Sequence, residues 1–171
     1  MSVTRSDFPL PDVAWPPTRE FWSAAARGEL ALPRCEGCGR LHWYPEERCR
    51  GCGDSRHRWE RMSGAGTLFT WVVVRQPFLP QLRDQVPFLT GLVAVAEDPS
   101  VRLAARIVEC EPAELRIDMP LEVVFRPLSF GGVARRVPAP FFRPAAQPSP
   151  RLPSTLQMPA PRAAMKRNAK Q

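Results

Sequence analysis

The chain has 171 residues, enough for one ordinary domain or two small ones, and 44% of them are hydrophobic, enough for a compact core. No apolar stretch approaches the roughly 20 residues of a membrane span, and the polar N-terminus holds no apolar signal segment, so we expect a cytoplasmic protein without a membrane span. The net charge of +7 at first suggests a nucleic-acid binder. However, residues 143–171 hold six of the 24 basic residues and none of the 17 acidic ones, which leaves residues 1–142 with a net charge of +1.

The first predicted element is a helical arm within residues 1–33. Several prolines make residues 1–17 an extended lead-in, Thr18 is the predicted N-cap, and Arg19–Arg27 is the predicted helix, with Gly28 as the residue after its C-cap. Three residues share one face of this helix: Phe21, Trp22 and Ala25. That aromatic face either packs on the rest of the chain or docks on a partner protein.

Residues 34–58 contain two CxxC pairs, and they are the strongest local motif in the chain. The four cysteines are Cys35, Cys38, Cys49 and Cys52, in the pattern C-x2-C-x10-C-x2-C. Glycines inside and after each pair suit a tight turn whose N–H groups point at sulfur. A closed set of four thiolates indicates a structural zinc site of the zinc-ribbon type. Two disulfides and a rubredoxin-like iron site are the alternatives.

Two other potential metal ligands or nucleophiles lie near or beyond the ribbon. His42 falls between the CxxC pairs, and because four cysteines already complete the ligand set, it is predicted to be a surface residue on a short hairpin. Cys110 stands alone after an apolar stretch. It is predicted to be a structural thiol, because no flanking histidine or helix start would activate it.

Residues 59–143 are predicted to form a β-barrel. Residues 59–66 hold two glycines and read as a hinge. Five β-type segments follow: Thr67–Arg75, Phe88–Ala96, Val101–Val108, Leu121–Arg126 and Val133–Val137, the last extending toward Phe142. A short helix at Glu111–Leu115 separates the third and fourth, which is the plan of an OB-fold. Gly91 would permit the sharp coiling that such a barrel needs.

A long loop, Gln76–Pro87, joins the first two predicted strands. It carries Phe78, Leu79 and Leu82. Apolar residues on a long loop predict either a recognition loop or a cap on the open end of the barrel.

The C-terminal segment 144–171 is rich in proline, basic residues and small polar residues. This composition cannot bury enough apolar surface to offset its ordering entropy, so we predict a disordered tail. It is either inert or an interaction arm.

Taken together, these motifs resemble the acyl-CoA-associated OB-fold zinc-ribbon family, long catalogued as a domain of unknown function. The matching segments are TREFWSAAARGEL, LPRCEGCGRLHWYPEERCRGCG, SGAGTLFTWVVVR, VPFLTGLVAVAE and DMPLEVVFRP, within residues 10–143. The resemblance implies a mainly β protein with an N-terminal helical arm, a rubredoxin-like zinc ribbon and a five-stranded OB barrel. It implies that the four ribbon cysteines are zinc ligands, and it implies no catalytic residue.

Members of this family are usually non-catalytic subunits. The resemblance therefore implies a protein that binds a thiolase-superfamily enzyme, a thiolase or an aldolase of steroid and lipid side-chain breakdown, and completes or gates its acyl-CoA site. Other members pair with MaoC-like hydratases. Four large aromatics are candidates for the partner contact, or for internal packing: Phe21, Trp22, Trp43 and Tyr44.

An acyl-CoA lying against this chain would need cations for its phosphates and an apolar wall for its acyl chain. The candidate cations are Arg75, Arg83 and Arg106, and the candidate wall residues are Phe78, Leu79 and Phe88. Each could instead be an ordinary surface or core residue.

The rival class is single-strand nucleic-acid binding, since OB-folds and zinc ribbons both serve it. Phe69 and Trp71, on one side of the first barrel strand, could stack bases. The near-neutral charge of residues 1–142 lacks the surplus that binding to phosphates demands, so nucleic acid is not the expected partner.

Overall fold

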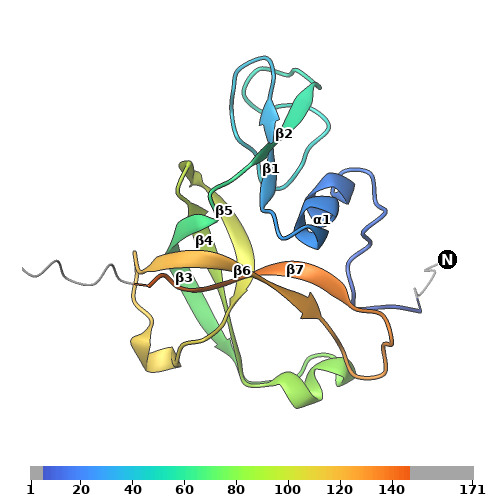
Figure 1. The fold of residues 1–171 in the computed structure, drawn as a ribbon, viewed down its shortest axis with the longest axis vertical. Coiled ribbons are helices and arrows are strands. Elements are labelled where there is room, and N and C mark those ends of the chain that lie inside the picture. The colour runs from blue at the N-terminus through green and yellow to red at the C-terminus, as the bar shows by residue number, and fades with distance from the viewer. Residues whose placement is uncertain (1–5, 147–171) are drawn as a thin grey trace, which may run out of the picture.

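The computed structural model describes residues 6–146 and is mainly β, as predicted (Figure 1). In chain order, the elements are α1 (Arg19–Ala26), β1 (Ala31–Cys35), β2 (His57–Arg61), β3 (Ala65–Val74), the 3₁₀ helix η1 (Pro80–Gln85), β4 (Phe88–Val95), β5 (Asp98–Ile107), the 3₁₀ helix η2 (Pro112–Glu114), β6 (Pro120–Leu128) and β7 (Val137–Pro144). Within the described residues, no helix combines the length and the apolarity needed to cross a bilayer. The predicted tail, 144–171, lies almost entirely outside the described residues.

The strand order confirms the predicted OB-fold. The five strands of the barrel follow one another as β3-β4-β5-β7-β6, and β6 closes the barrel by pairing with β3. Every neighbouring pair is antiparallel except β5 and β7, which run parallel and meet at Ile107 and Phe142. The short turn η2 lies between the third and fourth barrel strands, at the place predicted for a helix.

Two of the predicted boundaries are wrong. The predicted hinge at 59–66 begins inside a strand, because Trp59 belongs to β2 and pairs with Pro33 of β1. The fifth barrel strand, β7, begins at Val137, whereas the sequence predicted it to begin at Val133. A turn comes first, in which the N–H of Val133 donates to the carbonyl of Phe130 at 3.1 Å. A tight turn cannot belong to an extended strand.

The helix is close to its predicted span, but its N-cap differs from the prediction. Gly28 adopts a φ of +74° just after α1, as a residue beyond the C-cap should. Thr18 makes no side-chain capping bond, and its side chain is buried, with 3% of the residue exposed. Thr18 therefore contributes to packing, and only its backbone carbonyl serves the helix, accepting from the N–H of Trp22 at 3.1 Å.

The arm, the ribbon and the barrel share one hydrophobic core. Its members include Phe21 of α1, Leu32 of β1, Met62 between ribbon and barrel, and Leu103 and Phe142 of the barrel. Figure 1 shows the ribbon strands β1 and β2 standing on the barrel, with α1 beside β1 and above β7. A common core fixes the ribbon to the barrel, so a disturbance of one affects the other.

Gly91 is required for close approach between strands β3 and β4. A Cβ at this position would lie 2.6 Å from the carbonyl oxygen of Thr70 and 3.0 Å from Cδ1 of Leu68. We expect Gly91→Ala to lower the free energy of unfolding by about 1–3 kcal/mol, because the backbone must shift to relieve the overlap. The control is Gly131→Ala, whose Cβ would meet nothing nearer than 3.9 Å. Urea denaturation of both variants tests this, and equal midpoints would contradict it.

Candidate functional site

The four ribbon cysteines converge as predicted. Their sulfur atoms all lie within 4.8 Å of one another. The Sγ atoms of Cys35 and Cys52 are 3.5 Å apart, as are those of Cys38 and Cys49, so no disulfide joins them. Zinc–sulfur bonds of about 2.3 Å in a tetrahedron give sulfur–sulfur separations of about 3.8 Å. The four cysteines are therefore positioned to bind a metal ion.

Backbone turns hold the cysteines in place. The N–H of Gly39 donates to the carbonyl of Cys35 at 3.0 Å, and the N–H of Gly53 donates to that of Cys49 at 2.8 Å. Gly51 also directs its N–H at the sulfur of Cys49, at 3.3 Å. In each pair the first cysteine is buried and the second is exposed. The site thus lies at the edge of the ribbon, with two of its cysteines buried and two exposed.

The acidities of these thiols fit a cation site. Burial raises the pKa of Cys49, but the N–H groups of Cys52 and Gly51 and the neighbouring thiols outweigh it and lower that pKa to about 6. The N–H of Asp54 lowers the pKa of Cys52, yet the other cysteines raise it to about 12. The Cys49 thiolate therefore forms readily while Cys52 resists ionisation, and a divalent cation removes that conflict.

The prediction that His42 is a surface residue is wrong. Only 7% of His42 is exposed, and its ring lies edge-on to that of His57 with centroids 5.3 Å apart. The hairpin between the CxxC pairs faces the barrel, so His42 lines the same cavity as Ser100 and Val101 of β5. Its Nε2 atom has no hydrogen-bond partner among the described residues. This burial comes from tertiary packing that the local sequence does not reveal.

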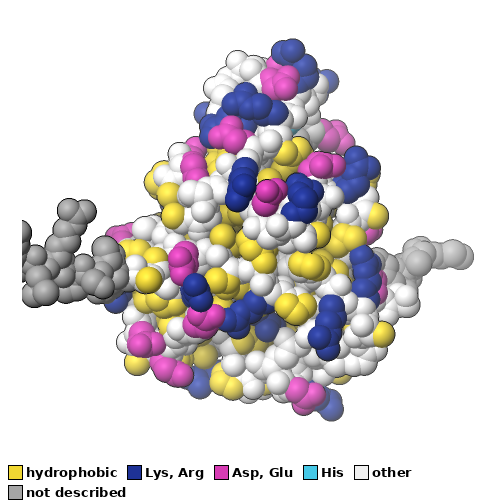
Figure 2. Space-filling view, viewed as in Figure 1, with side chains coloured by type: hydrophobic (Ala, Val, Ile, Leu, Met, Phe, Trp, Pro, Cys, Tyr) yellow, Lys and Arg dark blue, Asp and Glu magenta, His cyan; other side chains and the backbone are white. Residues whose placement is uncertain are grey.

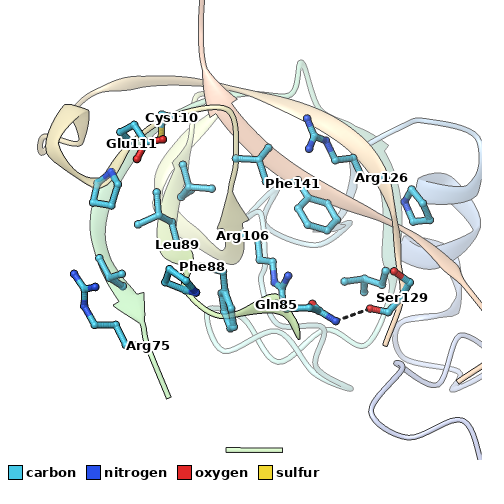
Figure 3. A pocket seen from close by; sticks show the side chains of 17 residues that line it. Arg75, Gln85, Phe88, Leu89, Arg106, Cys110, Glu111, Arg126, Ser129 and Phe141 are labelled. Carbon is cyan, nitrogen blue, oxygen red and sulfur yellow. Dashed lines mark hydrogen bonds between the residues drawn. The ribbon is translucent and has the colours of Figure 1, made fainter. Parts of the chain in front are cut away.

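A second feature is a cavity of about 560 Å³ in the barrel, on the side of η1 (Figure 3). We call it the outer cavity. It brings together three of the candidate residues for acyl-CoA, Arg75, Arg106 and Phe88. Arg83, Phe78 and Leu79 do not line it. Arg83 is exposed on η1, and 85% of Phe78 is exposed to solvent.

Sequence reasoning missed several polar residues of the outer cavity, among them Arg126 and Gln85. Arg126 of β6 reaches it while forming an ion pair with Glu109. Gln85 lines it from η1 and donates its amide to the carbonyl of Ser129 at 2.8 Å, the bond dashed in Figure 3. Closure of the barrel brings these residues together from distant segments, so no local motif marks them.

Two arginines of β5 stack on phenylalanine rings. The guanidinium carbon of Arg106 lies 4.0 Å from the ring centre of Phe88, and that of Arg102 lies 3.6 Å from the ring centre of Phe69. Arg106 is partly buried, and this burial lowers its pKa, whereas Arg102 is exposed. One face of Phe69, a candidate base-stacking residue, is thus covered by Arg102.

Cys110 lines the outer cavity and is partly buried. Burial raises the pKa of its thiol, and the carboxylates of Glu114 and Glu111 raise it further. This environment favours the protonated thiol over the nucleophilic thiolate. It is consistent with the structural role predicted for Cys110.

The candidate interface aromatics differ in their exposure to solvent, from buried to exposed. Phe21 is 4% exposed and packs on Trp43, with ring centroids 4.5 Å apart, so it belongs to the core. Tyr44 is 51% exposed and stacks on Trp15 at 5.9 Å. Figure 2 shows apolar side chains scattered among charged ones over the face below the ribbon. Tyr44 and Trp15 are therefore accessible to a partner, whereas Phe21 is not.

Known proteins share both parts of this architecture. Two family models match the chain: "ChsH2, rubredoxin-like zinc ribbon domain" over residues 22–58 and "ChsH2, C-terminal OB-fold domain" over residues 59–126. A DUF35 domain-containing scaffold protein of Methanocaldococcus jannaschii is 30% identical over 101 residues, covering 58% of this chain and 69% of that protein. A scaffold protein of the same description from Methanothermobacter thermautotrophicus is 27% identical over 101 residues, covering 58% and 74%.

One solved structure, described as "Ltp2-ChsH2(DUF35) aldolase", is similar to the chain at 27% identity and a TM-score of 0.62. The similarity covers 75% of this chain and 94% of that chain. Fold and site define a class: a four-cysteine metal-binding ribbon packed on an OB barrel. Within this class the chain belongs to the DUF35 family, which confirms the resemblance found in the sequence.

Proposed function

We propose that this chain is a cytoplasmic, non-catalytic subunit that binds a thiolase-superfamily enzyme, a thiolase or a lipid side-chain aldolase, and completes or gates its acyl-CoA site. The similarity to the ChsH2 chain of an aldolase carries the proposal, because it spans 94% of that chain. The scaffold descriptions of two archaeal relatives support it. The raised pKa of Cys110 and the placement of both histidines in the ribbon are consistent with catalysis by the partner.

We assign zinc as the metal of the ribbon and the four cysteines as its ligands. The all-sulfur ligand set and the sulfur separations support zinc in a structural role. The match of residues 22–58 to a zinc-ribbon family model adds to this. Elemental analysis of the purified chain should find one zinc per molecule, and iron in its place would redirect the assignment to a rubredoxin-like centre.

The first test is co-purification from the native host. We expect a thiolase-superfamily enzyme to elute with this chain in a fixed ratio, and the double variant Trp15→Ala/Tyr44→Ala to reduce the recovered partner at least tenfold, because these exposed aromatics suit an interface centre. Ile117→Ala, an exposed residue beside η2, is the control and should retain the partner. A hot-dog hydratase of the MaoC type in the complex would replace the proposed partner, and no partner at all would refute the proposal.

The second part of the proposal concerns the acyl-CoA. In the outer cavity, Arg75 supplies a cation for a phosphate and Phe88 an apolar wall. Titration calorimetry of the complex with an acyl-CoA should show weaker binding for Arg75→Ala. Arg83→Ala is the matched control, because Arg83 lies on the neighbouring η1 and does not line the cavity. Equal binding heats for the two variants would show that Arg75 does not contribute to binding of the acyl-CoA.

A further inference from the structure

A smaller cavity of about 230 Å³ lies between α1, the ribbon and the barrel. We call it the inner cavity. It lies where β5 and β7 diverge, since these two strands pair only at Ile107 and Phe142. Aromatic and small apolar side chains dominate its lining, among them Phe21, Trp22, Trp43, Ala105, Pro140 and Phe141. Such a lining suits an apolar group and offers little to a polar one.

The inner and outer cavities meet at a single charged residue. Three residues line both cavities: Arg106, Leu128 and Phe141. Among the residues that the structure describes, Arg106 is the only charged one in the lining of the inner cavity. Figure 3 shows its side chain inside the outer cavity, close to Phe88 and Gln85. The guanidinium stacks on Phe88, which lines only the outer cavity. An apolar chain that extends from the inner cavity past Leu128 and Phe141 toward the outer cavity therefore reaches this cation at its end.

Arg106 has no acidic partner among residues 6–146. Its contact is the ring of Phe88, and burial is the single cause of its lowered pKa, with no carboxylate acting on it. Other arginines of the barrel are paired: Arg126 with Glu109, and Arg143 with both Glu109 and Glu122. A partly buried cation without a counter-ion is costly, and an anion placed against it would recover that cost.

We infer that the inner cavity and Arg106 form a binding site for an amphipathic anion, whose apolar body lies between α1 and the diverging strands and whose anionic group pairs with the guanidinium. The chemical class is an apolar chain that ends in a carboxylate or a phosphate. This site goes beyond the proposed function, because it requires neither the partner enzyme nor coenzyme A. Trp22 and Trp43 line it and report its occupancy by fluorescence.

The test titrates the isolated full chain with octanoate, octyl phosphate, octanol and inorganic phosphate, following tryptophan fluorescence and heat. We expect at least one of the two octyl anions to bind tenfold or more tightly than octanol, and inorganic phosphate to leave the tryptophan signal unchanged. Comparison of octanoate with octyl phosphate identifies the anionic group. Octanol binding as tightly as both anions, or no binding of either anion, would overturn the inference.

Variants separate this site from a general effect on folding. Arg106→Gln should weaken binding of the anion at least tenfold and leave octanol unaffected. Arg102→Gln is the matched control, because Arg102 lies on the same strand and also stacks on a phenylalanine, outside both cavities. Ala105→Leu, which fills the inner cavity, should abolish binding with Arg106 in place. Equal losses for the two arginine variants, or undiminished binding by Ala105→Leu, would refute the site; circular dichroism melts confirm that each variant is folded.

Discussion

Removal of the metal should destabilise the barrel as well as the ribbon. We expect Cys35→Ser to bind well under one metal ion per chain and to lower the free energy of unfolding by an amount on the order of 5 kcal/mol, a fraction of the roughly 10–16 kcal/mol that structural zinc contributes in zinc-finger peptides. Cys35 is fully buried and ends β1, the strand that carries the core residue Leu32. Loss of the metal removes the restraint on the end of β1, and the packing of Leu32 in the shared core is weakened.

Elemental analysis and thermal unfolding measure the two effects together. Cys110→Ser is the control, because Cys110 is a partly buried thiol outside the metal cluster. It should keep its metal and change the stability by no more than about 1 kcal/mol. A strong chelator added to the unmodified chain should reproduce the result of Cys35→Ser. If the metal-free chain melts at the same temperature as the loaded chain, the ribbon does not depend on the ion.

The second large effect is expected at the closure of the barrel. Phe142 is completely buried, and it is the residue through which β7 meets β5, with its carbonyl accepting from the N–H of Val108 at 2.8 Å. Phe142→Ala should lower the free energy of unfolding by about 3–5 kcal/mol, since it removes a buried ring and leaves a cavity between the sheet edges. Urea denaturation followed by circular dichroism measures this change.

Phe78→Ala is the matched control for this prediction. It deletes the same ring from a loop position where 85% of the residue is exposed. We expect a change within about 0.5 kcal/mol. If Phe142→Ala were as mild as Phe78→Ala, the parallel junction between β5 and β7 would not hold the barrel closed.

Local sequence patterns predicted the elements of this fold well where short-range physics decides them. The CxxC pairs identified the four-cysteine cluster because tight turns fix the sulfur atoms within a few residues. Runs of β-type residues located the first four barrel strands, and Gly28 marked the end of α1. The wrong boundaries, at 59–66 and before Val137, fall where a strand is defined by its pairing partner. Pairing between distant segments cannot be deduced from either segment alone.

In the outer cavity, too, the sequence suggested candidate residues, and the tertiary structure decided which of them lie together. Chemistry alone suggested arginines and aromatics for an acyl-CoA, and three of the named residues, Arg75, Arg106 and Phe88, do lie together. Arg83 was an equally good candidate from the sequence, but it lies on η1 and does not line the cavity. Arg126 lines the cavity but was not predicted. Residue type limits which side chains suit a ligand, whereas barrel closure selects those that face the same space.

The sequence by itself determined the four-cysteine ribbon and the positions of the first four barrel strands along the chain, because spacing and periodicity act over a few residues at a time. The resemblance of its motifs, taken together, indicated the family and with it the OB barrel. Only the tertiary structure decided that His42 is buried against β5 and that the arm shares its core with the ribbon and barrel. It alone also showed that Arg106 lies between two cavities and, among residues 6–146, has no acidic partner. These features depend on contacts between residues far apart in the chain, and such contacts exist only once the barrel has closed.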